Sequence, residues 1–438
     1  MESNTSNRSR LIAKNILVSF VTKGWSAVTV LLMVPLTLKM LGVYSNGVWL
    51  TISGILMWID FMDIGLGNGL RNAVAFYIAK GDALKVREAI SSTFFMLIAI
   101  VLPLTFLLCA AIQLFNMYTT LGIAPQSIAN LDKILTVAIV IACSTFILKS
   151  VGNFYMGLQL PAINNLIICI GQTLALALTF IAYLIGCKSL MIVVVINTAS
   201  PLLIWIISLP YTFWIKYPQY KPSFRCVDLG MSRNLCSAGV QFFILQICGV
   251  ILFTSTNIII SKMFSPAEVT PYQVVYRYFS IILVAFNTVC LPFWNATTDA
   301  YARNDIIWIK QTEHKLNLLV IGAFASLAIM LILSKQVYTV WIGDSIQIPF
   351  SLSVSMALYI ITLIVSLRYS YILNGINILH IQLLFTIIAT VVFLPLAWAA
   401  CKYVGTVTAL VCAMCLVQIP GLIANAWKYH QLFGNKKK

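Results

Sequence analysis

The chain has 438 residues, of which 61% are hydrophobic and 9% are charged, and its formal net charge is +16. Soluble globular domains carry about 25% charged residues, so this composition excludes a water-soluble domain and indicates a surface that faces lipid. The basic balance does not indicate a nucleic-acid partner, because membrane proteins carry excess lysine and arginine on their cytoplasmic side.

Apolar stretches long enough to cross a bilayer recur along the whole chain. A spanning helix needs about 20 mostly apolar residues. The sequence predicts twelve such helices, at residues 15–38, 44–66, 89–115, 133–156, 163–186, 189–213, 235–261, 269–294, 315–334, 347–373, 380–401 and 405–427. We therefore expect an all-α polytopic membrane protein with short connections.

The lysines and arginines predict how these helices are oriented. With the N-terminus inside, 18 of the 28 basic residues fall on the cytoplasmic side, 6 on the outer side and 4 within helices. Such a bias is what the positive-inside rule predicts. We therefore expect a multi-pass protein of the cytoplasmic (inner) membrane with both termini cytoplasmic.

The twelve predicted helices divide into two similar halves. Residues 1–215 and 234–438 each contain six helices, and the basic segment 216–233 is predicted to be a cytoplasmic linker. In each half a polar, charged loop follows the second helix, at 68–88 and at 295–315. Equivalent helices run in the same direction. The pattern predicts two six-helix bundles related by a pseudo-two-fold axis along the membrane normal.

Four basic residues fall inside predicted membrane spans, where an ionisable side chain costs about 2.5–3.5 kcal/mol and marks a candidate site. They are Lys23, Lys149, Arg277 and Arg368. No acidic residue lies at comparable depth, so we expect an anionic ligand such as a phosphate. The alternative is that the side chains reach the membrane surface, which is easier for Lys149 and Arg368, near the cytoplasmic side, than for the deeper Lys23 and Arg277.

Two polar residues in the seventh helix, Gln246 and Asn257, are candidate substrate-binding donors at similar depths. Amides in the middle of membrane helices also serve as hydrogen bonds between helices, and that alternative stays open.

The end of the second helix carries a charged, glycine-rich segment. We expect it to form a cytoplasmic gate or loop, with the candidate residues Asp60, Asp63, Gly67, Gly69 and Arg71. A structural role for the two carboxylates, close to Arg71, is the alternative. The segment lacks the third glycine of a nucleotide-binding fingerprint and does not follow a strand, so we expect no nucleotide.

No metal or other cofactor is expected. Cys412 and Cys415 form a CxxC within an apolar helix, without a second cysteine pair or a nearby histidine. Buried free cysteine behaves as a small hydrophobic residue.

The segment Asp63-Ile-Gly-Leu-Gly-Asn-Gly-Leu-Arg-Asn72, together with Trp341-Ile-Gly343, resembles bacterial O-antigen and capsular polysaccharide flippases. These form the polysaccharide transporter family of the multidrug/oligosaccharidyl-lipid/polysaccharide exporter superfamily. The resemblance implies a two-bundle fold with a central cationic cavity. It also implies movement of an undecaprenyl-diphosphate-linked oligosaccharide from the inner to the outer leaflet by alternating access. Membrane lipids, a polysaccharide polymerase and glycosyltransferases would then be candidate partners, and the protein would not be an enzyme.

Two alternatives remain at this stage. One is a cation-coupled multidrug antiporter of the same superfamily, which needs a buried carboxylate; Asp60 and Asp63, near the surface, are the nearest candidates. The other is a membrane-embedded polysaccharide polymerase, which would carry a larger outer or catalytic loop than the sequence offers.

Overall fold

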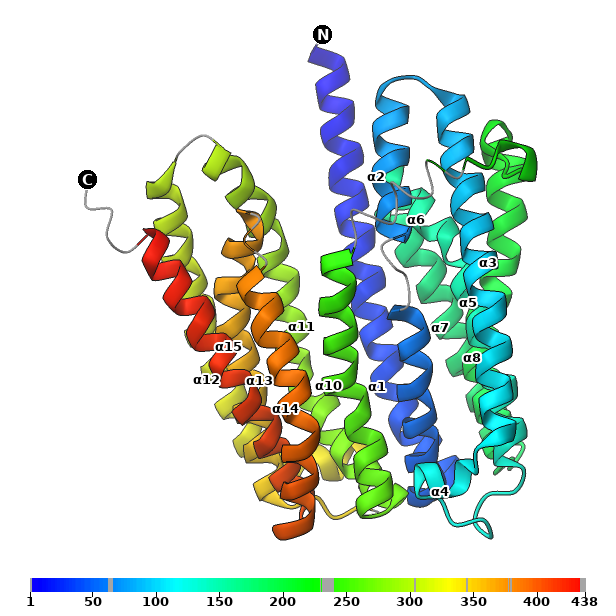
Figure 1. Ribbon diagram of the computed structural model, residues 1–438, viewed down its shortest axis with the longest axis vertical. Helices are drawn as coiled ribbons and strands as arrows, with labels where there is room; N and C mark the ends of the chain where they lie inside the picture. The colour runs from blue at the N-terminus through cyan, green and yellow to red at the C-terminus, as the bar shows by residue number, and fades with distance from the viewer. Residues whose placement is uncertain are drawn as a thin grey trace. The chain divides into compact units, whose positions relative to one another are not determined.

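The computed structural model describes residues 2–61, 66–228, 230, 240–302, 305–343, 346–376, 378 and 380–433. Within these ranges the secondary structure is helical, with no β-strand (Figure 1). The chain divides into two compact units, residues 1–243 and 244–438. Each unit is described by itself below.

Unit 1 is a bundle of long helices with two short ones. Figure 1 shows α3, α5 and α8 running side by side, and α1 lies along α7. The helices are α1 (Glu2–Phe61), α2 (Leu66–Ala79), α3 (Ala83–Leu114), α4 (Met117–Leu121), α5 (Leu131–Leu148), α6 (Ser150–Gly157), α7 (Pro161–Leu184) and α8 (Leu190–Pro210).

The helix α1 comprises two helices that meet at Gly42. This residue has φ 73° and ψ 171°, a non-helical conformation that only glycine adopts freely. The first two predicted crossings, 15–38 and 44–66, therefore follow one another with almost no connecting loop.

Glycines allow close approaches between the helices of unit 1. A Cβ atom at Gly157 would lie 2.7 Å from Val74 Cβ and 2.9 Å from the backbone oxygen of Arg71, so α6 packs directly on α2. A Cβ atom at Gly171 would lie 3.1 Å from Pro201 Cα, which brings α7 close to α8.

Unit 2 is also built from long helices, with α13 packed against α11, α12 and α15. Its core includes the fully buried side chains of Tyr272, Tyr359 and Phe393. The helices are α10 (Val240–Met263), α11 (Pro266–Ala302), α12 (Ile306–Ile342), α13 (Phe350–Gly375), α14 (His380–Tyr403) and α15 (Val407–Phe433).

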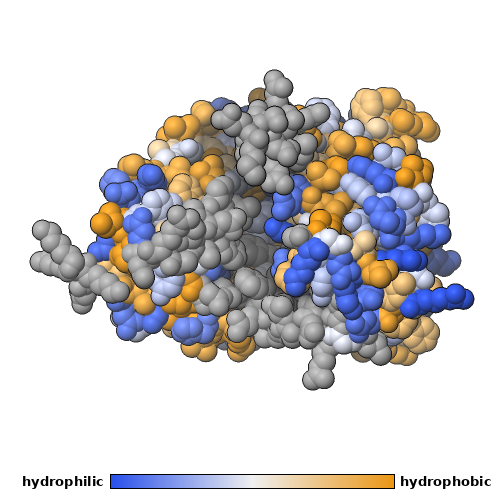
Figure 2. Space-filling model, turned by 90° about the horizontal axis from the view of Figure 1, so that it is seen from above, coloured by the Kyte–Doolittle hydropathy of each residue, from blue (hydrophilic) through white to orange (hydrophobic). Residues whose placement is uncertain are grey.

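The prediction of an all-α polytopic membrane protein is confirmed. In the described residues, ten helical segments are long and apolar enough to cross a membrane. Dividing the first of them at Gly42 and adding α10 accounts for all twelve predicted crossings. The pseudo-two-fold relation between the halves stays a prediction. Figure 2, a view from above, shows hydrophilic and hydrophobic residues interspersed on the described surface of this end.

The prediction that residues 68–88 and 295–315 form loops is wrong, because most of these residues are helical. Most of the first is helical, in α2 and the start of α3, and most of the second lies in α11 and α12. The carboxylates of Asp82 and Asp305 accept backbone N–H groups of Lys85 and Trp308, at 3.0 and 2.9 Å, and so cap α3 and α12. The helices therefore begin before their apolar windows do.

Residues 211–228, within unit 1, form a strap that packs on its helices α3 and α6. The strap contains a π-helix (Tyr211–Lys216) and two 3₁₀ helices (Pro218–Tyr220 and Phe224–Cys226). Arg87 Nε donates to the Lys221 carbonyl at 2.8 Å, and the backbone N–H of Ser223 donates to Ser91 Oγ at 3.0 Å. The described part of the predicted linker is thus fastened to α3.

Aromatic rings join the strap to α6. The rings of Tyr217 and Tyr220 lie 5.5 and 5.9 Å, centroid to centroid, from that of Phe154, and the Lys216 ammonium lies 5.5 Å from the Tyr155 ring. Burial raises the pKa of the Tyr217 phenol. The strap therefore contacts the helix that follows Lys149.

Candidate functional site

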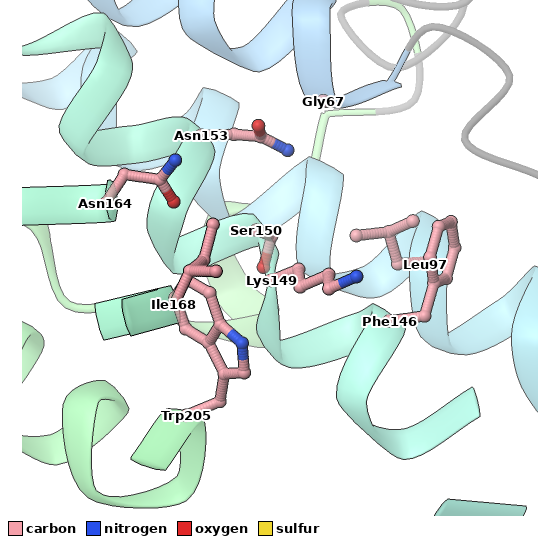
Figure 3. Close-up of a pocket in the computed structure, with 9 residues that line it drawn as sticks. All are labelled: Gly67, Leu97, Phe146, Lys149, Ser150, Asn153, Asn164, Ile168 and Trp205. Atoms are coloured by element: carbon pink, nitrogen blue, oxygen red, sulfur yellow. The ribbon is translucent and has the colours of Figure 1, made fainter. Parts of the chain in front are cut away.

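A cavity of about 240 Å³ lies within unit 1, among α2, α3, α5, α6, α7 and α8 (Figure 3). It has polar and apolar walls, and we call it the Lys149 cavity. The residues that line it are Gly67, Leu97, Phe146, Lys149, Ser150, Asn153, Asn164, Ile168 and Trp205.

Lys149 occupies a break between α5 and α6. Its carbonyl oxygen accepts the backbone N–H of Gly152 at 2.8 Å and that of Asn153 at 3.4 Å, so the hydrogen bonding changes locally from the α to the 3₁₀ pattern. This break changes the direction in which the next turn presents its side chains. The half-buried Lys149 side chain extends toward Leu97 and Phe146 (Figure 3).

The wall opposite Lys149 depends on Gly152. A Cβ atom at this position would lie 2.1 Å from Asn164 Oδ1 and 2.9 Å from Trp205 Cη2. Trp205 is 2% exposed, so its indole is fixed by its neighbours. The Asn164 amide nitrogen donates to Met156 Sδ of α6 at 3.8 Å, so this amide contacts α6. The absence of a side chain at Gly152 thus lets α7 and α8 approach α6.

The chemistry of the Lys149 cavity suits an anion. Among the described residues that line it, Lys149 is the only charged one. Asn153 and Asn164 supply amide groups, and Ser150 supplies a hydroxyl whose proton is donated to the Ile147 carbonyl at 2.7 Å. A lysine ammonium is a compact charge that binds phosphate oxygens, and amides add neutral donors.

The predicted gate residues that the structure describes lie in different environments. Gly67 lines the Lys149 cavity, and Gly69 is buried on the same helix, α2. Arg71 is exposed two residues later. The side chain of Asp60, and Asp63 altogether, lie outside the described residues.

Lys23 lies on α1 with an exposed side chain, and it does not line the Lys149 cavity. Two residues farther on, Trp25 Nε1 donates to Thr173 Oγ1 of α7 at 3.0 Å. This part of α1 is therefore fixed against α7.

Arg368 lies in unit 2, where it is engaged by protein groups. Its guanidinium donates to Asn317 Oδ1 of α12 and to the Tyr369 hydroxyl, and it lies 4.1 Å from the centre of the Tyr369 ring. These contacts tie α13 to α12.

The remaining predicted residues also belong to unit 2. Asn257 is buried, and its side-chain oxygen accepts the Gln273 amide at 2.7 Å, which joins α10 to α11. Arg277 lies on α11 and is half-buried. Gln246 lies on α10, and its side chain is outside the described residues.

Sequence reasoning did not select Ser150, Asn164 or Trp205 as site residues. The signal that could have found Ser150 is its position next to Lys149. Asn164 and Trp205 reach the cavity through packing across Gly152, which no local pattern reveals.

Comparison with known proteins identifies the family. The sequence profile of the family described as "Polysaccharide biosynthesis protein" matches residues 12–291, which is more than half of the chain. The chain belongs to this polysaccharide biosynthesis family. The resemblance to polysaccharide exporters inferred from the sequence is thereby confirmed.

A relative from Salmonella typhi, described as "Putative O-antigen transporter", is 25% identical to this family member over 270 residues. The match covers 60% of this chain and 60% of the relative. The chain thus matches less than two-thirds of that relative's length.

Solved structures share the fold of this family member. An inward-facing multidrug resistance MATE family transporter of the MOP superfamily has a TM-score of 0.77 at 15% identity, covering 93% of this chain and 96% of that one. An outward-facing MATE family transporter has a TM-score of 0.59 at 15% identity, covering 95% and 97%. At these identities the likeness establishes the MATE-type fold alone.

Proposed function

We propose that the protein is a flippase that moves a polyprenyl-diphosphate-linked oligosaccharide from the inner to the outer leaflet of the cytoplasmic membrane. The two units would alternately open the substrate path to the two sides, and the product would serve O-antigen, capsule or related polysaccharide biosynthesis. Membership of the polysaccharide biosynthesis family and the transporter fold support this proposal.

The observation that carries the proposal is the Lys149 cavity. Its lysine lies within a membrane-spanning segment, and the amides of Asn153 and Asn164 line the same cavity. A lysine ammonium and neutral amide donors suit the anionic oxygens of a lipid diphosphate. The cavity chemistry thus favours the anionic substrate.

The charge on Lys149 sets the size of the expected effect. Two unit charges about 4 Å apart interact by about 4 kcal/mol at an effective dielectric constant of 20. Lys149 is half-buried, so water screens part of this energy. We expect Lys149→Ala to slow transport by roughly 10- to 100-fold, at about 1.4 kcal/mol per factor of ten.

The test is transport in liposomes that contain the purified protein and a fluorescent lipid-diphosphate oligosaccharide in the inner leaflet. Wild type, Lys149→Ala and Lys149→Arg are compared, and Lys39→Ala is the control because Lys39 is an exposed lysine of unit 1 outside the cavity. We expect transport in wild type and the control, partial transport with arginine, and a large loss with alanine.

One outcome would contradict the proposed flippase, and another would contradict only the role of the Lys149 cavity. Wild type that moves no lipid-diphosphate oligosaccharide, yet exports a cationic dye, would favour the antiporter. Equal transport by wild type and Lys149→Ala would leave a flippase that does not use this cavity.

A further inference from the structure

Unit 1 contains a second cavity, of about 400 Å³, at the other end of α5. Two lysines and several small polar residues line it, and we call it the distal cavity. Its polar lining residues are Ser45, Ser127, Asn130, Lys133, Lys188 and Ser189.

The distal cavity and the Lys149 cavity share one helix. Lys133 lies in the first turn of α5, and Lys149 directly follows the last turn. Sixteen residues at 1.5 Å each separate the two lysines by about 24 Å along the helix axis. This is close to the thickness of the hydrocarbon core, about 30 Å. The two cavities are therefore far enough apart to lie near opposite faces of a membrane that α5 crosses.

Hydrogen bonds from two tyrosines hold the wall of the distal cavity in place. The Tyr118 hydroxyl donates to the Ile128 carbonyl at 2.9 Å and accepts the backbone N–H of Leu131 at 3.1 Å. The Tyr44 hydroxyl accepts the backbone N–H of Ala124 at 2.9 Å. The segment before α5 is thus an ordered wall, and Lys133 extends from a fixed helix start.

The charges at this cavity are positive. Lys133 comes from α5 and Lys188 precedes α8, so two different segments bring their ammonium groups to one cavity. Among the described lining residues, none is acidic. The nearby Asp132 has one carboxylate oxygen buried outside the cavity. Two cations with three serine hydroxyls and an asparagine amide are suited to a group with several anionic oxygens.

We propose that the distal cavity binds a phosphate-bearing lipid headgroup on the outer side of the membrane. If the proposed function holds, the diphosphate of the transported lipid is the occupant, and the cavity receives it after transfer from the Lys149 cavity. An anionic phospholipid of the outer leaflet presents the same chemistry and is the other source.

Inorganic pyrophosphate binding to the purified full-length protein tests the site. All variants compared carry Lys149→Ala, which removes the charge of the Lys149 cavity. In this background we compare Lys133→Ala/Lys188→Ala, Lys133→Arg/Lys188→Arg and the control Lys39→Ala by titration calorimetry in neutral detergent. We expect the double alanine variant to bind at least about tenfold more weakly, and the arginine variant and the control to bind as the background does.

The same affinity in the double alanine variant and its background would overturn the proposal. A loss of binding in both the alanine and the arginine double variants would also overturn it, because it would point to packing instead of charge. Both lysines are exposed, so we expect these variants to fold.

A second measurement distinguishes the two sources. Pyrophosphate titrations are repeated in nanodiscs of neutral lipid, with and without anionic phospholipid, and transport by Lys133→Ala/Lys188→Ala is measured with Lys149 intact. Slowed transport assigns the site to the substrate diphosphate. Unchanged transport, with pyrophosphate displaced by anionic phospholipid, assigns it to a lipid headgroup. A wild type that transports nothing but binds pyrophosphate in the distal cavity refutes the proposed function and leaves this site standing.

Discussion

Replacing Gly152 by alanine tests the packing that forms the Lys149 cavity. The new Cβ atom would lie 2.1 Å from Asn164 Oδ1 and 2.9 Å from the Trp205 ring. The Asn164 side chain can rotate away, but Trp205 is 2% exposed and has little room to move. Overpacking of this kind costs about 1–3 kcal/mol. Alanine recovers about 0.5–1 kcal/mol through its higher helix propensity. We expect a net loss of up to roughly 2 kcal/mol.

The larger expected effect is on transport, because Asn164 would leave the cavity wall. Melting of the purified protein and transport in liposomes are measured together. Gly322→Ala is the matched control, since Gly322 is also helical and a Cβ atom there has no heavy atom within 4 Å. Gly152→Ala should cost less stability in an Asn164→Ala background than in the wild-type background, because the Asn164 side chain is then absent. Equal melting and equal transport for Gly152→Ala and Gly322→Ala would refute the packing argument.

Three further predictions concern other parts of the molecule. Arg368→Lys keeps the charge but loses the fork that donates to Asn317 and Tyr369; we expect melting of the purified protein to show a loss of about 1–3 kcal/mol. Gly42→Ala should cost about 1–3 kcal/mol through backbone strain alone, since the space around Gly42 is open; unchanged melting would contradict this. Outward movement of two negative charges through about 100 mV gains up to roughly 4–5 kcal/mol, so collapsing the potential with ion gradients held should slow transport. An unchanged rate would exclude this contribution.

The positions of the membrane helices could be predicted from the sequence because each one contains an apolar window. Their ends could not, because hydropathy marks only the part of a helix that lies in lipid. The start of α3 was predicted at residue 89 and lies at Ala83, and that of α12 was predicted at 315 and lies at Ile306. The capping residues Asp82 and Asp305 were readable signals for both starts.

The candidate site could be predicted only as far as charge in an apolar helix reveals it. Lys149 was selected for that reason, and the structure gives it a cavity. The same reasoning selected Arg368, whose partner Asn317 lies 51 residues away in the chain and cannot be recognised from spacing. The roles proposed for Lys23, Arg277 and Gln246 stay predictions.

The hydrogen bonds of the strap make residues 211–228 a structural part of unit 1. A protein cut or extended between Tyr217 and Asp228 would lose hydrogen bonds that belong to α3, including that from the Asp228 N–H to Ser92 Oγ at 2.8 Å. Separate expression of the halves should therefore divide the chain after Asp228. Tension on the chain beyond this point would reach Phe154, the neighbour of a cavity residue, through the tyrosine rings. The strap thus contacts α6 through these rings as well as continuing the chain from α8.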